Sequence, residues 1–285
     1  MRLHALAEKV GGIDALDQIA EPSAGAVRQV VGHGRLKDAL SGTWLGHPLH
    51  PLLTDVPIGL FTGATVLDLL AGDRGEHAAD VLVAAGLAAA VPTAAAGAAD
   101  WSDSFGEDMR IGVVHAGANV AGLALYALSL RRRRRGERTA GTALGLAAMA
   151  TMTIGGYLGG TLSHNRGVGV NHAFAEHGPP DWTAVLAEAQ LAERRPQRVE
   201  AGDASVLLYR SNGSIHAIGS RCTHAGGPLD EGIVDAQRCT VRCPWHGSVF
   251  RLDDGSVVHG PASVPQPAYE ARARAGQIEI RRRRP

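Results

Sequence analysis

The sequence predicts a protein of two domains, an N-terminal all-α bundle of four transmembrane helices and a C-terminal all-β domain. Apolar residues concentrate in four stretches before residue 165, and the apolar period changes to two after residue 181. Aromatic residues make up 4% of the 285 residues, while glycine contributes 37. Small residues suit the close approach of membrane helices, whereas a soluble core of this size needs bulkier side chains.

The whole-chain composition excludes several classes of protein. Lys and Arg total 28, as do Asp and Glu, so no net field favours nucleic acid as a partner. Three cysteines are too few for a disulfide scaffold, and an odd number cannot pair completely within one chain. The N-terminus lacks a continuous apolar run behind its first basic residue, so we expect no cleaved signal peptide. Metal ligation and free thiols are the cysteine roles that remain.

Residues 1–43 predict an amphipathic helical lead-in, which we expect to pack against the bundle. The four-helix transmembrane domain is predicted over 44–165, and its apolar stretches are each about 20 residues long, enough to cross a hydrocarbon core of about 30 Å. These stretches are residues 51–72, 78–99, 111–130 and 139–162. A soluble bundle is the alternative, because Asp55 and Asp68 lie in the first stretch. The third and fourth stretches hold no charged residue and favour the membrane.

One end of this bundle is predicted to be rich in histidine. Because consecutive spans alternate in direction, the starts of the first and third spans share a membrane face with the ends of the second and fourth. The histidines at those ends are His47, His50, His115 and His164. Asp55 lies about one turn inside the first span, and we expect it to face the bundle interior, since a carboxylate in hydrocarbon needs a partner. These residues are either interfacial side chains and helix caps or a site for haem, a metal ion or a quinone.

Residues 166–181 are polar and glycine-rich, with a Pro179-Pro180 stop, and predict a linker. From residue 182 to 285 the pattern indicates a small all-β domain that ends in a basic tail. Short runs of β-branched and aromatic residues there are separated by turn signals such as Asn212-Gly213 and Asp254-Gly255.

All three cysteines lie in this β domain, and two of them have matching surroundings. Cys222 and His224 form C-x-H, and Cys243 and His246 form C-x-x-H, with 18 residues between the two motifs. Together they supply two thiolates and two imidazoles on two loops. That is a four-ligand set for zinc or for an iron–sulfur cluster.

The residues around these ligands separate the two options. The segments CTHAGGPL from Cys222 and CPWHGSVF from Cys243 closely resemble the two cluster-binding boxes of the Rieske [2Fe–2S] family, and Pro261 lies in a segment similar to that family's proline loop. The resemblance implies that Cys222 and Cys243 bind one iron and that His224 and His246 bind the other. It also implies that Ser248 and Pro261 lie around the cluster and tune it.

Departures from the family pattern refine the subtype. Gly227 and Trp245 stand where Rieske proteins of cytochrome bc complexes carry an extra disulfide, and Phe250 stands where high-potential members usually have a tyrosine. The resemblance therefore implies a ferredoxin-like subtype of lower potential within the Rieske range. Cys239 matches no ligand position, and we expect it to be a buried strand thiol.

The helical region also resembles a known family. The segment GHPLHPLLTDVPIG, residues 46–59, is similar to the opening of a bacterial four-helix membrane domain of unknown function, DUF2231. The two resemblances predict an oxidoreductase component, a membrane-anchored Rieske-type carrier of single electrons between a reductase or quinone pool and an acceptor that docks over an exposed histidine edge. Two alternatives stay open: a haem- or quinone-binding membrane oxidoreductase that uses the β domain as its wire, and a membrane redox sensor.

Two arguments about the membrane side of the β domain conflict. Near the ends of the spans, seven basic residues lie on the face of the 131–138 loop and four on the histidine face, so the positive-inside rule puts the β domain outside the cytoplasm. The missing disulfide favours the cytoplasm, because family members without it are mostly cytoplasmic. We expect a multi-pass protein of the cell membrane whose β domain is extracytoplasmic, with membrane lipid as a further partner of the chain.

Overall fold

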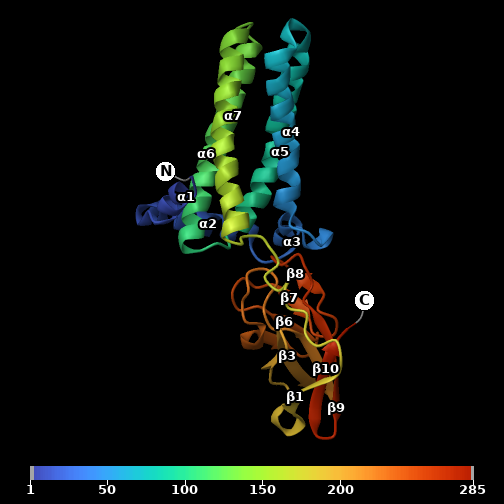
Figure 1. The fold of residues 1–285 in the computed structure, drawn as a ribbon. Helices are drawn as coiled ribbons and strands as arrows, with labels where there is room; N and C mark the ends of the chain where they lie inside the picture. Colours follow the sequence, from blue (N-terminus) through green and yellow to red (C-terminus); the bar gives the residue numbers. More distant parts are fainter. Residues whose placement is uncertain (1–2, 284–285) are drawn as a thin grey trace. The chain divides into compact units, whose positions relative to one another are not determined.

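The chain divides into two compact units. In the computed structural model, which describes residues 3–283, one unit comprises Met1–Val30 and Leu49–Val168, and the other comprises Val31–Pro48 and Gly169–Pro285. We call them the helical unit and the β unit. Figure 1 shows the helices of the first and the sheets of the second.

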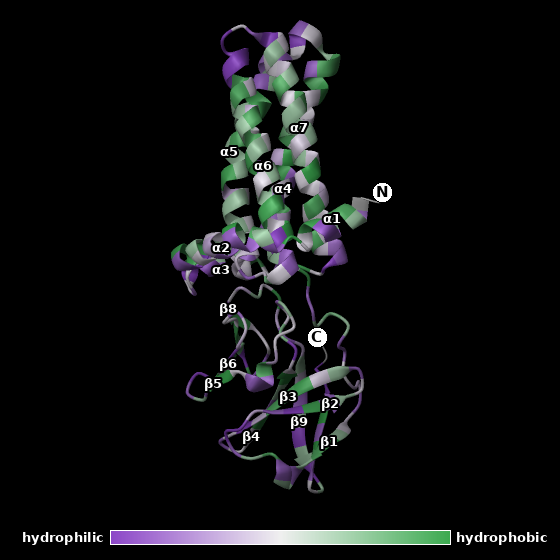
Figure 2. Cartoon of the chain, turned by 90° about the vertical axis from the view of Figure 1, so that its left-hand side faces the viewer, coloured by the Kyte–Doolittle hydropathy of each residue, from purple (hydrophilic) through white to green (hydrophobic). Residues whose placement is uncertain are grey.

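Four long helices form the body of the helical unit: α4 (Leu49–Leu70), α5 (Glu76–Trp101), α6 (Gly106–Arg133) and α7 (Arg138–Gly160). Each is long and apolar enough to cross a membrane, yet only 17–28% of the residues in their apolar windows are buried within the chain. Apolar residues run along these helices (Figure 2), and many of their large apolar side chains, such as Val91 and Val120, are exposed at the surface of the chain. Such a surface is stable in lipid and not in water, which confirms the predicted transmembrane fold.

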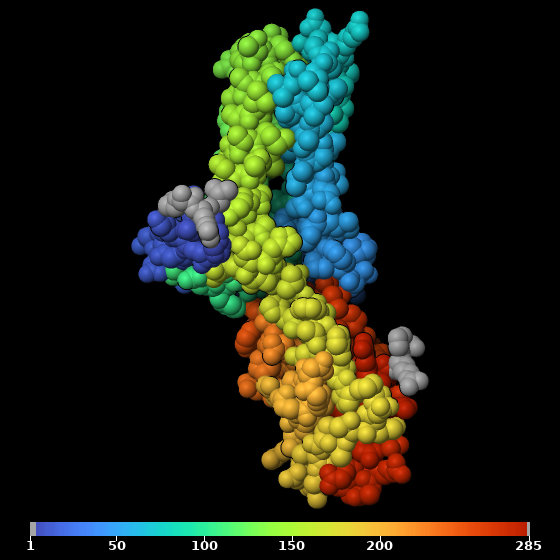
Figure 3. Space-filling view, in the orientation of Figure 1, coloured from blue at the N-terminus to red at the C-terminus, as the bar shows by residue number. Residues whose placement is uncertain are grey.

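The helices pack as two pairs, α4 with α5 and α6 with α7, and the pairs lie side by side (Figure 3). Glycine permits this close approach, because a Cβ at Gly86 would lie 2.6 Å from the Phe61 ring and one at Gly122 would lie 2.4 Å from Met152. The rings of Phe61 and Tyr126 stack at a centroid distance of 3.9 Å in the middle of this core. Few large side chains are needed in such an interface.

A buried ion-pair network occupies one end of the bundle. Arg133 is 1% exposed at its side chain and pairs with Asp68, which is 4% exposed. Arg138 donates to Asp68 and Asp80 at 2.6 Å each, and the Ser129 hydroxyl accepts a 3.0 Å hydrogen bond from Arg133. The pairing satisfies charges that would be very unfavourable alone in a low-dielectric interior.

The N-terminal lead-in is shared between the two units. Helices α1 (Leu3–Gly11) and α2 (Asp17–Val31) belong mostly to the helical unit, where Arg110 of α6 pairs with Asp17 at 2.7 Å. Helix α3 (Arg35–Ser41) and the 3-10 turn η2 (Thr43–Leu45) belong to the β unit instead. The expectation that the whole lead-in packs against the bundle is therefore wrong for residues 31–43.

The β unit contains two antiparallel sheets. The larger has the strand order β1-β10-β9-β4-β3-β2, and the smaller has the order β5-β6-β7-β8. The strands of the larger sheet are β1 (Thr183–Ala187), β2 (Gln197–Ala201), β3 (Ala204–Ser211), β4 (Ser214–Gly219), β9 (Ala268–Arg274) and β10 (Gln277–Arg282). Those of the smaller are β5 (Ile233–Asp235), β6 (Thr240–Arg242), β7 (Val249–Arg251) and β8 (Val257–His259).

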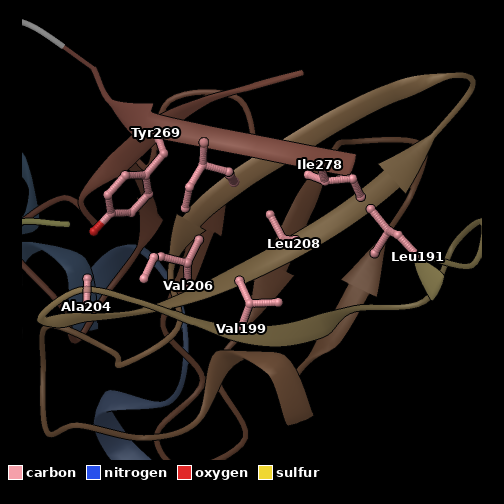
Figure 4. Close-up of a cluster of buried hydrophobic side chains, with 10 residues drawn as sticks. Leu191, Val199, Ala204, Val206, Leu208, Tyr269 and Ile278 are labelled. Carbon is pink, nitrogen blue, oxygen red and sulfur yellow. The ribbon is translucent and has the colours of Figure 1, made fainter. Parts of the chain in front are cut away.

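Strand β3 explains why the two sheets stay together. Its residues are buried on both faces, so Val206 and Leu208 enter one apolar cluster while Leu207 and Tyr209 enter another. Figure 4 shows the first cluster, in which Ile278 packs near Leu208. The second cluster includes Cys222 and Cys243, so the apolar core ends directly beneath the two motif loops.

Candidate metal centre

The first motif loop leaves the end of β4 and is closed by its own backbone. The N–H of Cys222 donates to Gly227 O at 2.9 Å, and the N–H of Gly226 donates back to Cys222 O at 2.8 Å. Gly226 has a φ of +79°, a left-handed conformation that glycine adopts without strain. The Thr223 hydroxyl donates to Val264 O at 2.7 Å and ties the loop to the segment after β8.

The second loop is the connection of the β6–β7 hairpin and repeats the same pattern. Arg242 and Val249 are paired across the hairpin, which leaves residues 243–248 as the loop. The N–H of Cys243 donates to Ser248 O at 2.8 Å, and the N–H of Gly247, with a φ of +77°, donates to Cys243 O at 3.2 Å. Two loops of equal geometry therefore present their cysteines in equivalent positions.

The four predicted ligands converge between these loops. The imidazole rings of His224 and His246 lie 4.9 Å apart at 83° to one another, and the Cys222 and Cys243 thiols are within hydrogen-bond reach. A Cβ at Gly227 would lie 2.9 Å from the Cys243 sulfur, so this position tolerates no larger residue beside the thiols. Two buried thiols and two imidazoles at one point match the donor set of a Rieske [2Fe–2S] cluster.

The electrostatics of the site favour metal binding. The hydrogen bond from Cys222 lowers the pKa of Cys243 to about 7, aided by the backbone N–H groups of Trp245 and His246, while the same pairing raises the pKa of Cys222. Burial, with the neighbouring His246, lowers the pKa of His224 to about 3, so its imidazole is neutral. Thiolate and neutral imidazole are the forms that bind metals.

The proline loop is held over the site by Ser248. This serine is fully buried, and its hydroxyl oxygen accepts the N–H of Ala262 at 2.9 Å. Pro261 precedes that residue, so the hydrogen bond fixes the loop predicted to cover the cluster. Phe250, in place of the tyrosine of high-potential relatives, is fully buried in the core below.

Residues 31–48 pack on this tip of the β unit, an arrangement that the sequence did not predict. Asp38 accepts the N–H of Gly260 at 2.7 Å and lies 2.9 Å from the His259 ring, and the Thr43 hydroxyl donates to Ala262 O at 3.1 Å. A Cβ at Gly247 would lie 3.3 Å from His33. The segment thus braces both the proline loop and the second ligand loop.

The same segment affects the solvent exposure of the ligands. His246 is 7% exposed and His224 is half-buried, so the expected exposed histidine edge is wrong for His246. Lys37 of α3 is 3% exposed and interacts electrostatically with His224. The only sequence feature that could have indicated this packing is the pair Gly32 and Gly34, which interrupts the helical pattern of the lead-in just before α3.

The predicted linker also contributes to the site. The N–H of His172 donates to Thr223 O at 3.1 Å, and Glu176 pairs with Arg221 at 2.8 Å, immediately before the first ligand. His172 also lies 3.8 Å from the position of a Cβ on Gly226. Residues 169–181 therefore support the first ligand loop as well as connecting two domains.

The structure brings together only part of the predicted membrane-face site. His50 and His115 lie inside the helical unit, close enough to interact electrostatically. His164 is exposed in the π-helical turn η4 (Thr161–Asn165), and His47 is an exposed residue of the β unit whose ring contacts its neighbour Pro48 O at 2.8 Å. Asp55 is exposed on α4, so the expectation that it faces the bundle interior is wrong. Asp55 lies within the first two turns of α4, near the end of the span, where an ionised side chain is closer to the membrane interface than to the bilayer centre.

His50 and His115 share one environment. The Nδ1 atom of His50 lies 3.0 Å from Thr93 O, and that of His115 lies 2.7 Å from Gly155 O. Glycine faces each ring: a Cβ at Gly97 would lie 2.6 Å from His50, and one at Gly159 would lie 2.9 Å from His115. A carbonyl that accepts the Nδ1 proton fixes the tautomer in which Nε2 is a potential metal ligand.

Comparisons with known proteins agree with this division of the chain. The sequence model of the Rieske [2Fe-2S] domain matches residues 181–270, and that of DUF2231, described as a predicted membrane protein, matches residues 46–172. The ferredoxin CarAc of Metapseudomonas resinovorans is 28% identical over 100 residues, which are 35% of this chain and 92% of that protein.

Two further matches cover stretches of this chain that are similar in length to its Rieske domain. Apoptosis-inducing factor 3 of Homo sapiens is 33% identical over 98 residues, which are 34% of this chain but only 16% of that protein. The solved ferredoxin of carbazole 1,9a-dioxygenase from Nocardioides aromaticivorans IC177 is 25% identical and covers 36% of this chain and 98% of its own, with a TM-score of 0.35. The chain therefore combines a DUF2231 predicted membrane domain with a C-terminal Rieske [2Fe-2S] domain, which implies a [2Fe–2S] cofactor and a role in electron transfer.

Proposed function

We propose that this protein is a membrane-anchored one-electron carrier in which Cys222 and Cys243 bind one iron and His224 and His246 bind the other. The observation that carries the proposal is the convergence of these four side chains between two loops of equal geometry. When bound, the cluster supplies reversible one-electron transfer at a potential raised by its neutral imidazole ligands.

The chain's own residues hold and shield this centre. Backbone N–H groups of both ligand loops donate toward the cysteine sulfurs, which stabilises negative charge there. Ser248 fixes the proline loop, and Asp38 and Thr43 fix it from the other side. Water is excluded from most of the site. His224 is half-buried and is the ligand nearest the surface, so electrons would enter and leave the cluster at this residue.

A redox partner protein follows from this arrangement. The relative CarAc is a ferredoxin that covers almost the same length as the β unit's Rieske domain, which supports a reductase as donor and an oxygenase or other oxidoreductase as acceptor. A quinone pool is the alternative donor, since the four candidate spans would hold the β unit at the membrane surface. Membrane lipid contacts the apolar outer faces of α4 to α7.

The test combines fractionation with electron counting on the full-length chain. Membranes washed with alkaline carbonate should retain the protein, and titration with dithionite should place one electron per chain on a centre that ferricyanide reoxidises completely. Replacement of His246 by Ala should abolish the uptake without releasing the protein from membranes. Release by carbonate, or uptake that survives His246→Ala, would overturn the proposal. Reduction by dithionite without transfer to any added reductase–acceptor pair would favour the redox sensor.

We propose as a second candidate function that His50 and His115 hold a haem iron or hydrogen-bond a quinone, so that the β unit serves the helical unit as its wire. It is favoured by the carbonyl contacts of both Nδ1 atoms and by the two glycines that make room for the rings. We expect about one haem per chain in the purified protein and no haem in the His50→Ala and His115→Ala variants. Absence of haem together with unchanged quinone content in these variants would exclude it.

We further propose that the β unit lies outside the cytoplasm. The basic loop at 131–138 supports this side under the positive-inside rule, although Arg133 and Arg138 of that loop are engaged by Asp68 and Asp80. Protease added to intact spheroplasts should cleave the β unit. Protection in spheroplasts, with cleavage in inverted vesicles, would place it in the cytoplasm.

A further inference from the structure

A second group of metal-ligating side chains lies in the β unit, apart from the cluster ligands. His216, Cys239 and Asp253 present one ligand atom each, and these atoms all lie within 4.8 Å of one another. We propose that these three residues form a mononuclear site for a divalent cation of the zinc class, with a fourth position open to solvent. The inference is independent of the electron-carrier function.

The fold brings these residues together from both sheets. Thr240 of β6 pairs with Arg251 of β7, so the residues just outside that pair, Cys239 and Leu252, face each other, and the Leu252 N–H donates to Cys239 O at 2.9 Å. Asp253 follows directly. His216 comes from β4 of the larger sheet, where it pairs with Tyr209. A cation held here would link β4 of the larger sheet to the β6–β7 hairpin of the smaller sheet.

The distances are close to those that a tetrahedral cation needs. His216 Nδ1 lies 2.9 Å from Asp253 Oδ1, and the Cys239 sulfur lies 3.4 Å from that oxygen and 3.9 Å from the same His216 Nδ1. Zinc bonds of about 2.0–2.3 Å at tetrahedral angles separate neighbouring ligand atoms by about 3.3–3.6 Å. Shifts of about half an ångström therefore convert the present contacts into a coordination triangle.

Cys239 is a turn residue rather than a strand residue. It lies in the turn before β6 with a φ of +51°, which is uncommon for a residue with a Cβ, and it is half-buried. The expected buried strand thiol is thus wrong. Glycine or asparagine would suit this conformation better.

The chemistry of the group suits a borderline metal. Burial and the hydrogen bond to Asp253 raise the pKa of the Cys239 thiol to about 11, so without metal the thiol is protonated and donates to that carboxylate. A cation displaces this proton to solvent and binds the thiolate, an imidazole and a carboxylate. One sulfur, one nitrogen and one oxygen exclude the all-oxygen sites of magnesium and calcium and fit zinc or cobalt.

An open cavity of about 380 Å³ adjoins the site and gives it access to solvent. His216 and Asp253 form part of its wall, and Trp182, Tyr269 and Arg283 form another part. The side chain of Asp253 is 58% exposed, whereas that of His216 is 15% exposed. The fourth coordination position therefore faces this cavity, where water or a small anion can complete the shell.

Cobalt is the probe that tests the site, because thiolate-bound Co²⁺ absorbs in the visible range. Co²⁺ is added to the full-length protein in detergent with its cluster intact, and difference spectra are recorded together with cobalt and iron counts after gel filtration. We expect one cobalt per chain, a thiolate-to-cobalt band that excess Zn²⁺ removes, and unchanged iron. A spectrum without a saturable thiolate band would overturn the site.

Variants assign the ligands, and the Rieske EPR signal verifies the fold of each. Cys239→Ser should abolish the thiolate band, and His216→Ala and Asp253→Asn should each weaken cobalt binding at least about tenfold. Asp254→Asn is the matched control, because its carboxylate instead accepts the N–H of Ser256 at 2.9 Å, and binding should be unchanged. A band that survives Cys239→Ser, or is lost equally in Asp254→Asn, would show that the metal binds elsewhere.

Discussion

The metal centre of the β unit and the buried ion-pair network of the helical unit hold charge in opposite ways. At the centre, the ligands lie within two segments of eight residues, and backbone N–H groups of the same loops stabilise the thiolates. In the network, Arg133 meets Asp68 across 65 residues of sequence, and side chains from different helices make most of the contacts that stabilise the charges. Local backbone geometry builds the first site, whereas helix packing builds the second.

This difference separates a functional site from a structural one. Loop geometry closes around the four ligands independently of the membrane helices, so changes in the helical unit should leave the cluster intact. The ion pairs depend on the approach of α4, α5, α6 and α7, so changes there should alter the stability of the bundle.

The largest effect is expected from loss of a cluster ligand. His246→Ala removes one of two imidazoles from one iron, so the iron content should fall from about two per chain to none, and the Rieske EPR signal should disappear. His216→Ala, at a histidine of the β unit that lies outside the cluster site, should leave the iron content and the EPR signal unchanged. His50→Ala should also keep both, and loss of the cluster in that variant would break the comparison.

A smaller but still large effect is expected from the ion-pair network. Arg133→Met leaves the buried carboxylate of Asp68 with a weakened partner set and should lower the free energy of unfolding by about 3–5 kcal/mol, measured by thermal unfolding in detergent. Arg132→Met is the adjacent control, because Arg132 is half-exposed in its pair with Glu137 and should change the free energy by less than about 1 kcal/mol. Equal effects of the two substitutions would show that burial of the network does not add to the free energy of unfolding.

The smallest effect is expected where residues 31–48 brace the proline loop. Asp38→Ala removes a charge-assisted hydrogen bond from the N–H of Gly260 and should destabilise the loop by about 1–3 kcal/mol. The cluster should remain but should bleach faster in the presence of an iron chelator. Asp14→Ala, at an 87% exposed carboxylate of the helical unit, is the control and should not alter the bleaching rate. A faster rate in both variants would contradict a specific brace.

The sequence predicted the features that are local in the chain. The convergence of the four candidate ligands and the contact of Ser248 with the proline loop follow from short motifs, and the four spans follow from continuous apolar stretches. Contacts between distant segments were missed: residues 31–48 share the helical periodicity of the lead-in, and nothing in that pattern indicates packing on loops more than 200 residues away. The predicted interior position of Asp55 failed because helix periodicity does not show which face of a uniformly apolar helix meets its neighbours.

A histidine-ligated cluster in a membrane-anchored chain should carry single electrons. A redox titration of the full-length protein in detergent, followed by EPR of the reduced centre, tests it most directly. We predict a one-electron transition between about −150 and +300 mV, the range of Rieske centres. A transition near −400 mV, which is typical of all-cysteine clusters, or zinc in place of iron would contradict the account.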